Sequence, residues 1–277
     1  MAKKIDFDKV HKSLIPIVRE YIEAIKEEYG EYMPFEKRRQ LDSIEDYGKI
    51  IYIHDFGSIN GWANDYGVHL PISVERIFKL MVFVPGYGWN KKHTTYSGED
   101  LVINDNTFGD YLKHVIFSGT DAQGYFEDML LHETMHFCGS GGSSALKEGI
   151  NEFLTRKIAL KKGFRTSACG YPKEVKVVYE LEKIFGEEVI NQIAFIDDEK
   201  MILTYLEKKL GKDAVVLYEN VSEKMEKEFY DKYYKNISSY KGAKGIIRKI
   251  VDYKKIDYKE VLKMMDKYKQ SKSKKIV

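Results

Sequence analysis

At residues 131–136 the chain reads LHETMH, which contains the pattern His-Glu-x-x-His. On a helix, residues i and i+4 share a face, so the imidazoles of His132 and His136 can reach one metal ion. Glu133 lies about 100° further round the helix, beside such a metal rather than on it. Zinc lowers the pKa of a water molecule toward ~7, and a carboxylate in that place can take up a proton and pass it to a leaving amine. The stretch therefore predicts a metal-binding helix with hydrolytic chemistry.

The neighbouring residues favour the helix, because Tyr125, Phe126, residues 129–131 and Phe137 supply an apolar face around the two histidines. The alternative is a buried helix whose histidines are hydrogen-bonded and bind no metal. A catalytic zinc site needs a third protein ligand. No histidine follows His136 anywhere in the chain, so a third histidine downstream is excluded.

A glutamate on a second helix is the other source of a third ligand. Residues 146–155 read LKEGINEFLT, directly after the Gly/Ser-rich stretch 139–144. Their apolar residues mark one buried stripe of a helix. Glu148 and Glu152 lie at i and i+4, an unfavourable pair of like charges unless a positive group is nearby. A zinc ion with its histidines would be that group, whereas two solvated surface acids are the alternative.

Residues 121–156 resemble the gluzincin metallopeptidases, the group that includes thermolysin. The resemblance implies a zincin-like core, Zn²⁺ as the cofactor, Glu148 as the third ligand and Glu152 as the acid that steadies a ligand histidine. The separation of His136 from Glu148 is short for this group, which leaves Glu152 open as the ligand. The resemblance also implies a donor to the oxyanion of the tetrahedral intermediate.

That donor must be a tyrosine or an arginine, because no histidine is left downstream of His136. Tyr171 is the candidate, with Tyr179 and Arg165 as alternatives. The resemblance further suggests an edge strand that pairs with extended substrate, and residues 111–118 are the candidate segment.

The bulk composition excludes several other classes of protein. The 277 residues carry 45 Lys+Arg against 43 Asp+Glu, a net charge of +2, which argues against a nucleic-acid-binding protein. Two cysteines are too few for a disulfide framework. Cys138 is expected to be a small core residue. No apolar run approaches the roughly 18 residues that span a bilayer. We expect a cytoplasmic protein with no membrane or nucleic-acid partner and leave its oligomeric state open.

The order of predicted elements indicates an α+β fold. An amphipathic helix is expected over 8–29, with Pro16 inside the pattern. Short β-rich runs alternate with turns from 49 to 120, and the remainder has helical periodicity up to a disordered basic tail at 269–275. We predict an α+β lobe with the metal-binding helix over 1–140, a helical lobe with the third ligand over 141–277, and a cleft between them.

These observations together predict a zinc metallopeptidase that hydrolyses peptide or protein substrates through a metal-activated water, with Glu133 as general base and then general acid. The alternative is a regulatory or interaction protein that keeps the zinc site without proteolytic turnover. Glu133 counts against this alternative, because a purely structural site needs no base beside an open position.

Overall fold

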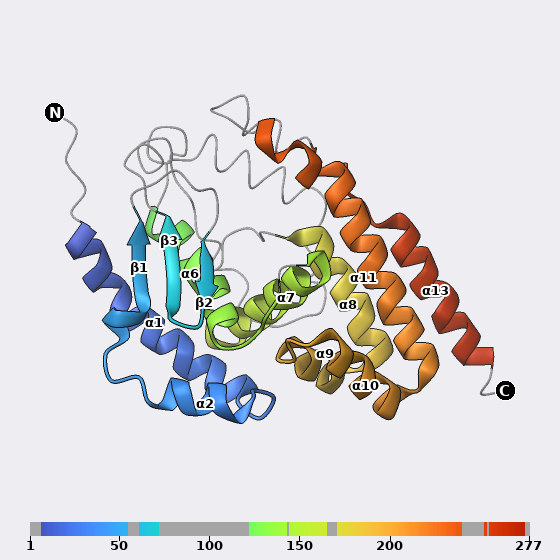
Figure 1. The fold of residues 1–277 in the computed structure, drawn as a ribbon, viewed down its shortest axis with the longest axis horizontal. Helices are drawn as coiled ribbons and strands as arrows, with labels where there is room; N and C mark the ends of the chain where they lie inside the picture. Colours follow the sequence, from blue (N-terminus) through green and yellow to red (C-terminus); the bar gives the residue numbers. More distant parts are fainter. Residues whose placement is uncertain are drawn as a thin grey trace. The chain divides into compact units, whose positions relative to one another are not determined.

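The structure is a computed structural model that describes residues 7–54, 61–71, 122–142, 144–164, 171–239, 252, 253 and 255–274. The described part is mostly helical with one small mixed sheet, so the α+β class is confirmed (Figure 1). The chain divides into two compact units. The first comprises Met1–Gly141 and Asn151–Gly170, and the second comprises Gly142–Ile150 and Tyr171–Val277.

Helix α1 (Phe7–Tyr29) opens the first unit, and the apolar spacing of this stretch predicts a helix there. Leu14, Val18, Ile22 and Ile25 repeat at helical intervals and are almost completely buried. Pro16 is exposed and the helix continues through it. Helix α2 (Phe35–Asp42) follows α1, and no sequence pattern had indicated it.

A three-stranded sheet with the order β1-β3-β2 follows these helices. The 3₁₀ helix η1 (Tyr47–Ile50) leads into β1 (Ile51–His54), which pairs in parallel with β3 (Gly67–Pro71). Strand β2 (Trp62–Asn64) pairs with β3 in the antiparallel sense. Period-two alternation buries Ile51, Val68 and Leu70 on one face of the sheet. Helix α1 contacts β1, and helix α6 contacts β2 and β3, and both helices lie behind the sheet in Figure 1.

Helices α6 (Ala122–Phe137) and α7 (Ala145–Lys162) carry the two motifs found in the sequence. Leu130, Leu131 and Met135 bury the apolar side of α6, which also packs against α1. Every residue of α7 from Gly149 to Ala159 is buried. A helix buried all round is held on several sides, which suits an element that must fix two carboxylates in position.

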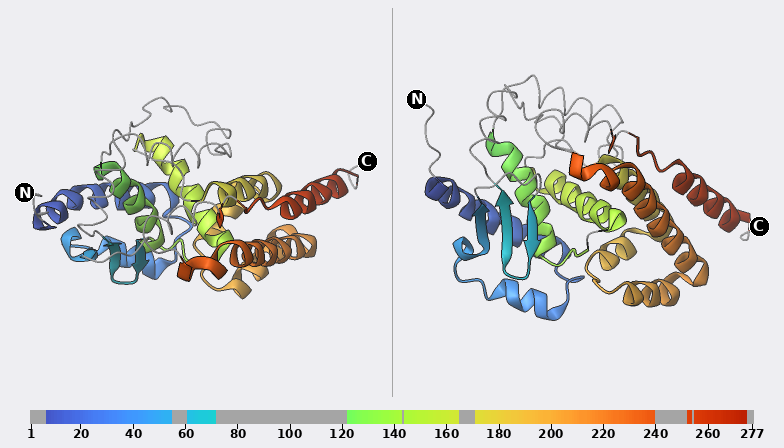
Figure 2. Two further views of the ribbon diagram at one scale, coloured as in Figure 1. Left: turned by 90° about the horizontal axis from the view of Figure 1, so that it is seen from above. Right: turned by 45° about the horizontal axis from the view of Figure 1, so that its top comes forward.

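The second unit is helical. It contains α8 (Pro172–Phe185), α9 (Glu187–Ala194), α10 (Glu199–Leu210), α11 (Lys212–Lys232), the 3₁₀ helix η2 (Tyr234–Ser239) and α13 (Lys259–Lys274). Gly186 and Gly211 adopt φ values of 90° and 88° and so allow the sharp turns from α8 to α9 and from α10 to α11. Helix α13 contacts α8 and α11 (Figure 2).

Several expectations from the sequence need correction or lie outside the described residues. The basic tail is not disordered up to Lys274, because Lys269 and Lys272 pair with Glu180 and Asp213. The part of the predicted β-rich region from 72 to 120, with the proposed edge segment 111–118, lies outside the described residues.

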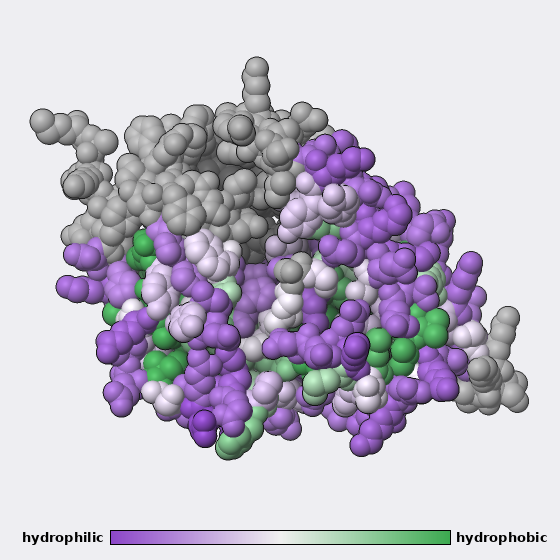
Figure 3. All heavy atoms as spheres, viewed as in Figure 1, coloured by the Kyte–Doolittle hydropathy of each residue, from purple (hydrophilic) through white to green (hydrophobic). Residues whose placement is uncertain are grey.

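Hydrophilic residues predominate on the described part of the surface shown in Figure 3. Among the helices that the structure describes, none has the length and apolar composition that a bilayer span requires.

Candidate metal centre

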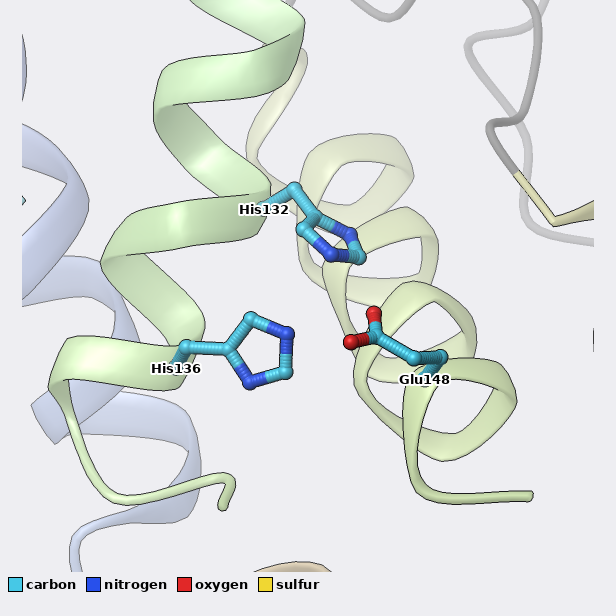
Figure 4. A group of neighbouring side chains, drawn as sticks. All are labelled: His132, His136 and Glu148. Atoms are coloured by element: carbon cyan, nitrogen blue, oxygen red, sulfur yellow. The ribbon is translucent and has the colours of Figure 1, made fainter. Parts of the chain in front are cut away.

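Three side chains from helices α6 and α7 converge on one point (Figure 4). His132, His136 and Glu148 each offer one ligand atom, and these atoms lie within 4.8 Å of one another. The two histidines lie one turn apart on α6, and their rings meet at an interplanar angle of 81° with centroids 4.9 Å apart. The structure thus brings together a His-His-Glu group close enough to bind a metal ion, as the sequence predicts.

The hydrogen bonds of the two imidazoles fit metal binding. His132 Nδ1 lies 2.7 Å from Glu152 Oε2, and His136 Nδ1 lies 2.6 Å from the carbonyl oxygen of Ser140. Both partners accept, so each Nδ1 carries the proton, and each Nε2 presents a lone pair. A second hydrogen bond of this kind fixes the tautomer and the ring orientation of metal-binding histidines.

The two glutamates of α7 therefore have different positions. Glu148 contributes to the His-His-Glu group, whereas Glu152, one turn later, bonds the back of the His132 ring. Asn151 strengthens the same link by donating from Nδ2 to the backbone oxygen of His132 at 3.1 Å. The roles of ligand for Glu148 and of supporting acid for Glu152 stay predictions, and Asn151 was not singled out in the sequence.

Glu133 is 6% exposed and lies against the chain segment that opens strand β2. A Cβ atom added at Gly61 would be 2.8 Å from Glu133 Cγ and 3.0 Å from its Oε1. The same atom would be 3.1 Å from the backbone oxygen of His69. Only a residue without a side chain leaves this space for the carboxylate. Gly61 belongs to no recognisable motif, so this contact could not be predicted from the sequence.

The first turn of α7, which carries Glu148, is held by residues of the second unit. Glu226 on α11 accepts a hydrogen bond from the backbone nitrogen of Ala145 at 2.8 Å, an anion at a helix N-terminus. Lys147 Nζ donates to the carbonyl oxygens of Ile193 and Ile196, each at 2.7 Å. Burial lowers the pKa of Lys147 to about 8. These contacts fix the beginning of the helix.

Gly149, directly after Glu148, packs closely on Glu174 of α8. A Cβ at Gly149 would lie 2.8 Å from Glu174 Cβ and 3.1 Å from its backbone carbon. Glu174 is fully buried and accepts hydrogen bonds from the hydroxyls of Tyr253 and Tyr258 at 2.5 and 2.6 Å. Burial raises the pKa of the Glu174 carboxyl above its ordinary value, and the two tyrosines oppose this shift. The helix turn that carries Glu148 therefore rests on a buried polar network.

The residues considered as donors to the oxyanion differ in their surroundings in the structure. Tyr171 is the half-buried N-cap residue of α8, and its role stays a prediction. Tyr179 lies beneath Lys183, whose Nζ is 3.9 Å from the ring centroid, and Arg165 lies outside the described residues. Tyr234, which the sequence did not single out among 21 tyrosines, has its pKa raised by burial, then by Glu148 and Glu226. The electrostatic surroundings of Tyr234 therefore include a member of the group.

Two histidines with no ligand spacing in the sequence are neighbours in the sheet. His54 Nε2 and His69 Nδ1 lie 2.8 Å apart, and the His69 ring stacks between Tyr52 and Trp62. Burial and the neighbouring His54 lower the pKa of His69. Cys138 is completely buried, which confirms its expected place in the core, and burial raises the pKa of its thiol.

Comparison of the chain with protein-family models, with curated proteins and with solved structures finds no match in any of the three.

Proposed function

We propose that the protein is a zinc-dependent peptidase. The observation that carries this proposal is the His132, His136 and Glu148 group, with both histidine Nδ1 atoms engaged by acceptors, which leaves each Nε2 as the atom that would bind a metal. Two imidazoles and one carboxylate are a ligand set that zinc uses when a fourth position stays open for catalysis. A zincin-like core is part of the same proposal.

His132, His136 and Glu148 would hold the metal, which when bound polarises a carbonyl and lowers the pKa of water. Glu133 takes the proton of the attacking water and later delivers it to the leaving amine. Its low exposure of 6% and its contact with Gly61 restrict the positions that the carboxylate can adopt. Glu152 keeps His132 in the correct tautomer and orientation.

Stabilisation of the oxyanion needs a donor that keeps its proton. Tyr171 is the residue that the resemblance to gluzincins suggests. Tyr234 is the competitor, because Glu148 is among the groups that raise the pKa of its hydroxyl. The variants Tyr171→Phe and Tyr234→Phe distinguish the two, since the true donor's variant loses turnover about 10²-fold or more while the other changes it little.

The first experiment is metal analysis of purified protein by elemental mass spectrometry. We expect about one zinc per chain in the wild type. The Glu148→Ala variant should lose it, and the Glu152→Ala variant should retain it when zinc is in excess. Loss with Glu152→Ala and retention with Glu148→Ala would reverse the ligand assignment. Absence of metal from wild type after zinc is offered would overturn the proposal.

The second experiment tests turnover on a peptide library with wild type and Glu133→Gln, both with verified metal content. The amide keeps the size of the side chain but cannot accept the proton, so we expect zinc binding without cleavage. Full activity of Glu133→Gln would contradict the mechanism. Stoichiometric zinc in wild type without cleavage of any peptide would favour the regulatory or interaction protein. Substrate, partners and a cytoplasmic location remain proposals.

A further inference from the structure

Helix α7 contains a buried arginine, two of whose guanidinium nitrogens have no hydrogen-bond partner among the described residues. Arg156 is 8% exposed, and its Nε and Nη1 atoms are buried without a hydrogen bond within the part of the chain that the structure describes. The other buried cations of the helix differ in this respect. Lys147 donates to two carbonyl oxygens, and Lys157 lies 5.3 Å from the centroid of the Phe153 ring.

A buried guanidinium that leaves two of its nitrogens without hydrogen bonds lowers the stability of the fold. It stays charged at every accessible pH, and removing its donors from water without partners costs several kcal/mol. Its rigid fork of donors matches the two oxygens of a carboxylate. A carboxylate on a ligand would therefore supply the hydrogen bonds that Arg156 lacks within the described residues.

The position of Arg156 on α7 relates it to the metal centre. It follows Glu152 by four residues and Glu148 by eight, which corresponds to about 6 and 12 Å along the helix axis. Side chains on a helix lean toward its N-terminus, which for Arg156 is the direction of both glutamates. Glu152, about 40° round the helix from Arg156, faces His132.

We propose that Arg156 binds a carboxylate of the substrate, namely the free C-terminus of a peptide two or three residues beyond the bond that is cleaved. Two or three extended residues span about 7–10 Å, which fits the spacing along α7 once the arginine leans back toward Glu148. The enzyme would then release short peptides from C-termini. This inference rests on the proposed peptidase function and names the class of its substrate.

The test compares two peptides of identical sequence, one ending in a carboxylate and one in an amide, using wild type, Arg156→Met and Arg156→Lys. We expect wild type to favour the free acid by about 10- to 100-fold in kcat/KM, the usual worth of a charged hydrogen bond. The preference should collapse toward one in Arg156→Met. It should fall only in part in Arg156→Lys, which keeps the charge but loses the fork. Lys157→Met, a matched loss of charge at the next residue, should keep the wild-type preference.

An unchanged preference in Arg156→Met, or no carboxylate preference in wild type, would overturn the proposal. An acidic side chain of the substrate is the other group that could supply a carboxylate to Arg156. A third peptide therefore has each of its Glu residues replaced by Gln. If this replacement lowers kcat/KM in wild type but not in Arg156→Met, the carboxylate site is supported, and its ligand is an acidic side chain of the substrate. The melting temperature gives an independent check. Arg156→Met should melt at or above the wild-type temperature, because it removes an unpaired buried charge. A lower melting temperature would show that the guanidinium has structural partners.

A final arm separates this inference from the proposed function. If no peptide is cleaved, the melting temperature of zinc-loaded Glu133→Gln is measured with N-acetylglycine and with uncharged N-acetylglycinamide. The double variant Glu133→Gln, Arg156→Met is measured in the same way. Stabilisation by the acid alone, lost in the double variant, supports the carboxylate site even though the peptidase proposal has failed. If the acid does not stabilise the protein in a way that depends on Arg156, the carboxylate site itself is overturned.

Discussion

Glu152 offers the sharpest test of how the metal centre is organised, because it should control metal affinity without being a ligand. Its Oε2 atom accepts from His132 Nδ1 at 2.7 Å, and the two side chains are only 6% and 12% exposed. Removing the carboxylate leaves the Nδ1–H group without this acceptor and frees the ring to rotate. The proton can also move to Nε2, the atom that would bind the metal.

The expected magnitude follows from this geometry. Loss of an outer partner of a ligand histidine weakens metal binding about 10- to 100-fold, or about 1.4–2.7 kcal/mol. Burial at this site places Glu152→Ala near the upper limit, because little water is available to replace the acceptor. Glu152→Gln keeps an oxygen that can accept from Nδ1 and loses only the charge, so we expect about tenfold.

The assay is competition for zinc against a chromophoric chelator of known affinity, which reports a dissociation constant rather than a metal count. Glu223→Gln on α11 is the matched control, because Glu223 is exposed and the substitution makes the same change in charge. Its affinity for zinc should equal that of wild type. Glu148→Ala marks the other extreme, the loss of a direct ligand.

Unchanged affinity in Glu152→Ala would refute the reasoning, since the hydrogen bond to His132 would then contribute nothing to the metal centre. A loss as large as that of Glu148→Ala would refute it in the other direction, because Glu152 would then behave as a ligand. The intermediate result alone supports an orienting role.

Three further predictions concern contacts away from the ligands. Gly61→Ala should lower kcat by about tenfold or more with metal content unchanged, because its Cβ would lie 2.8 Å from Glu133 Cγ; unchanged steady-state kinetics would count against the contact. Gly149→Ala should lower the free energy of unfolding in urea by about 1–3 kcal/mol through its clash with Glu174, although helix propensity alone predicts a gain of about 1 kcal/mol. Burial raises the pKa of Glu174 in the folded state, so the folded protein binds that proton more tightly than the unfolded chain does. Its contribution to stability is therefore present below the ordinary pKa and lost as pH rises toward the folded value; Glu174→Gln should lack this slope in urea titrations across pH, and equal slopes would contradict the assignment.

The sequence alone was sufficient for features that depend on local spacing. The apolar repeat of α1, the pair His132 and His136, and the pair Glu148 and Glu152 all follow from the 3.6-residue period of the helix. Helix α2 and strand β2 were not predicted from the sequence because both are short. Strand β2 has three residues, too few for a reliable alternation, and its pairing with β3 is a tertiary choice.

The period of α7 places Glu148 and Glu152 on one face but does not say which meets the metal and which meets His132. That depends on contacts between α6 and α7 that join residues apart in the sequence. Glu152 and Asn151 reach His132 across 20 and 19 residues. The sequence therefore determined the candidate ligands, because helical spacing is local. Only the tertiary structure decided which glutamate meets the histidine pair and which meets the back of His132, and the place of Gly61 beside Glu133, because these depend on which distant residues the folded chain brings into contact.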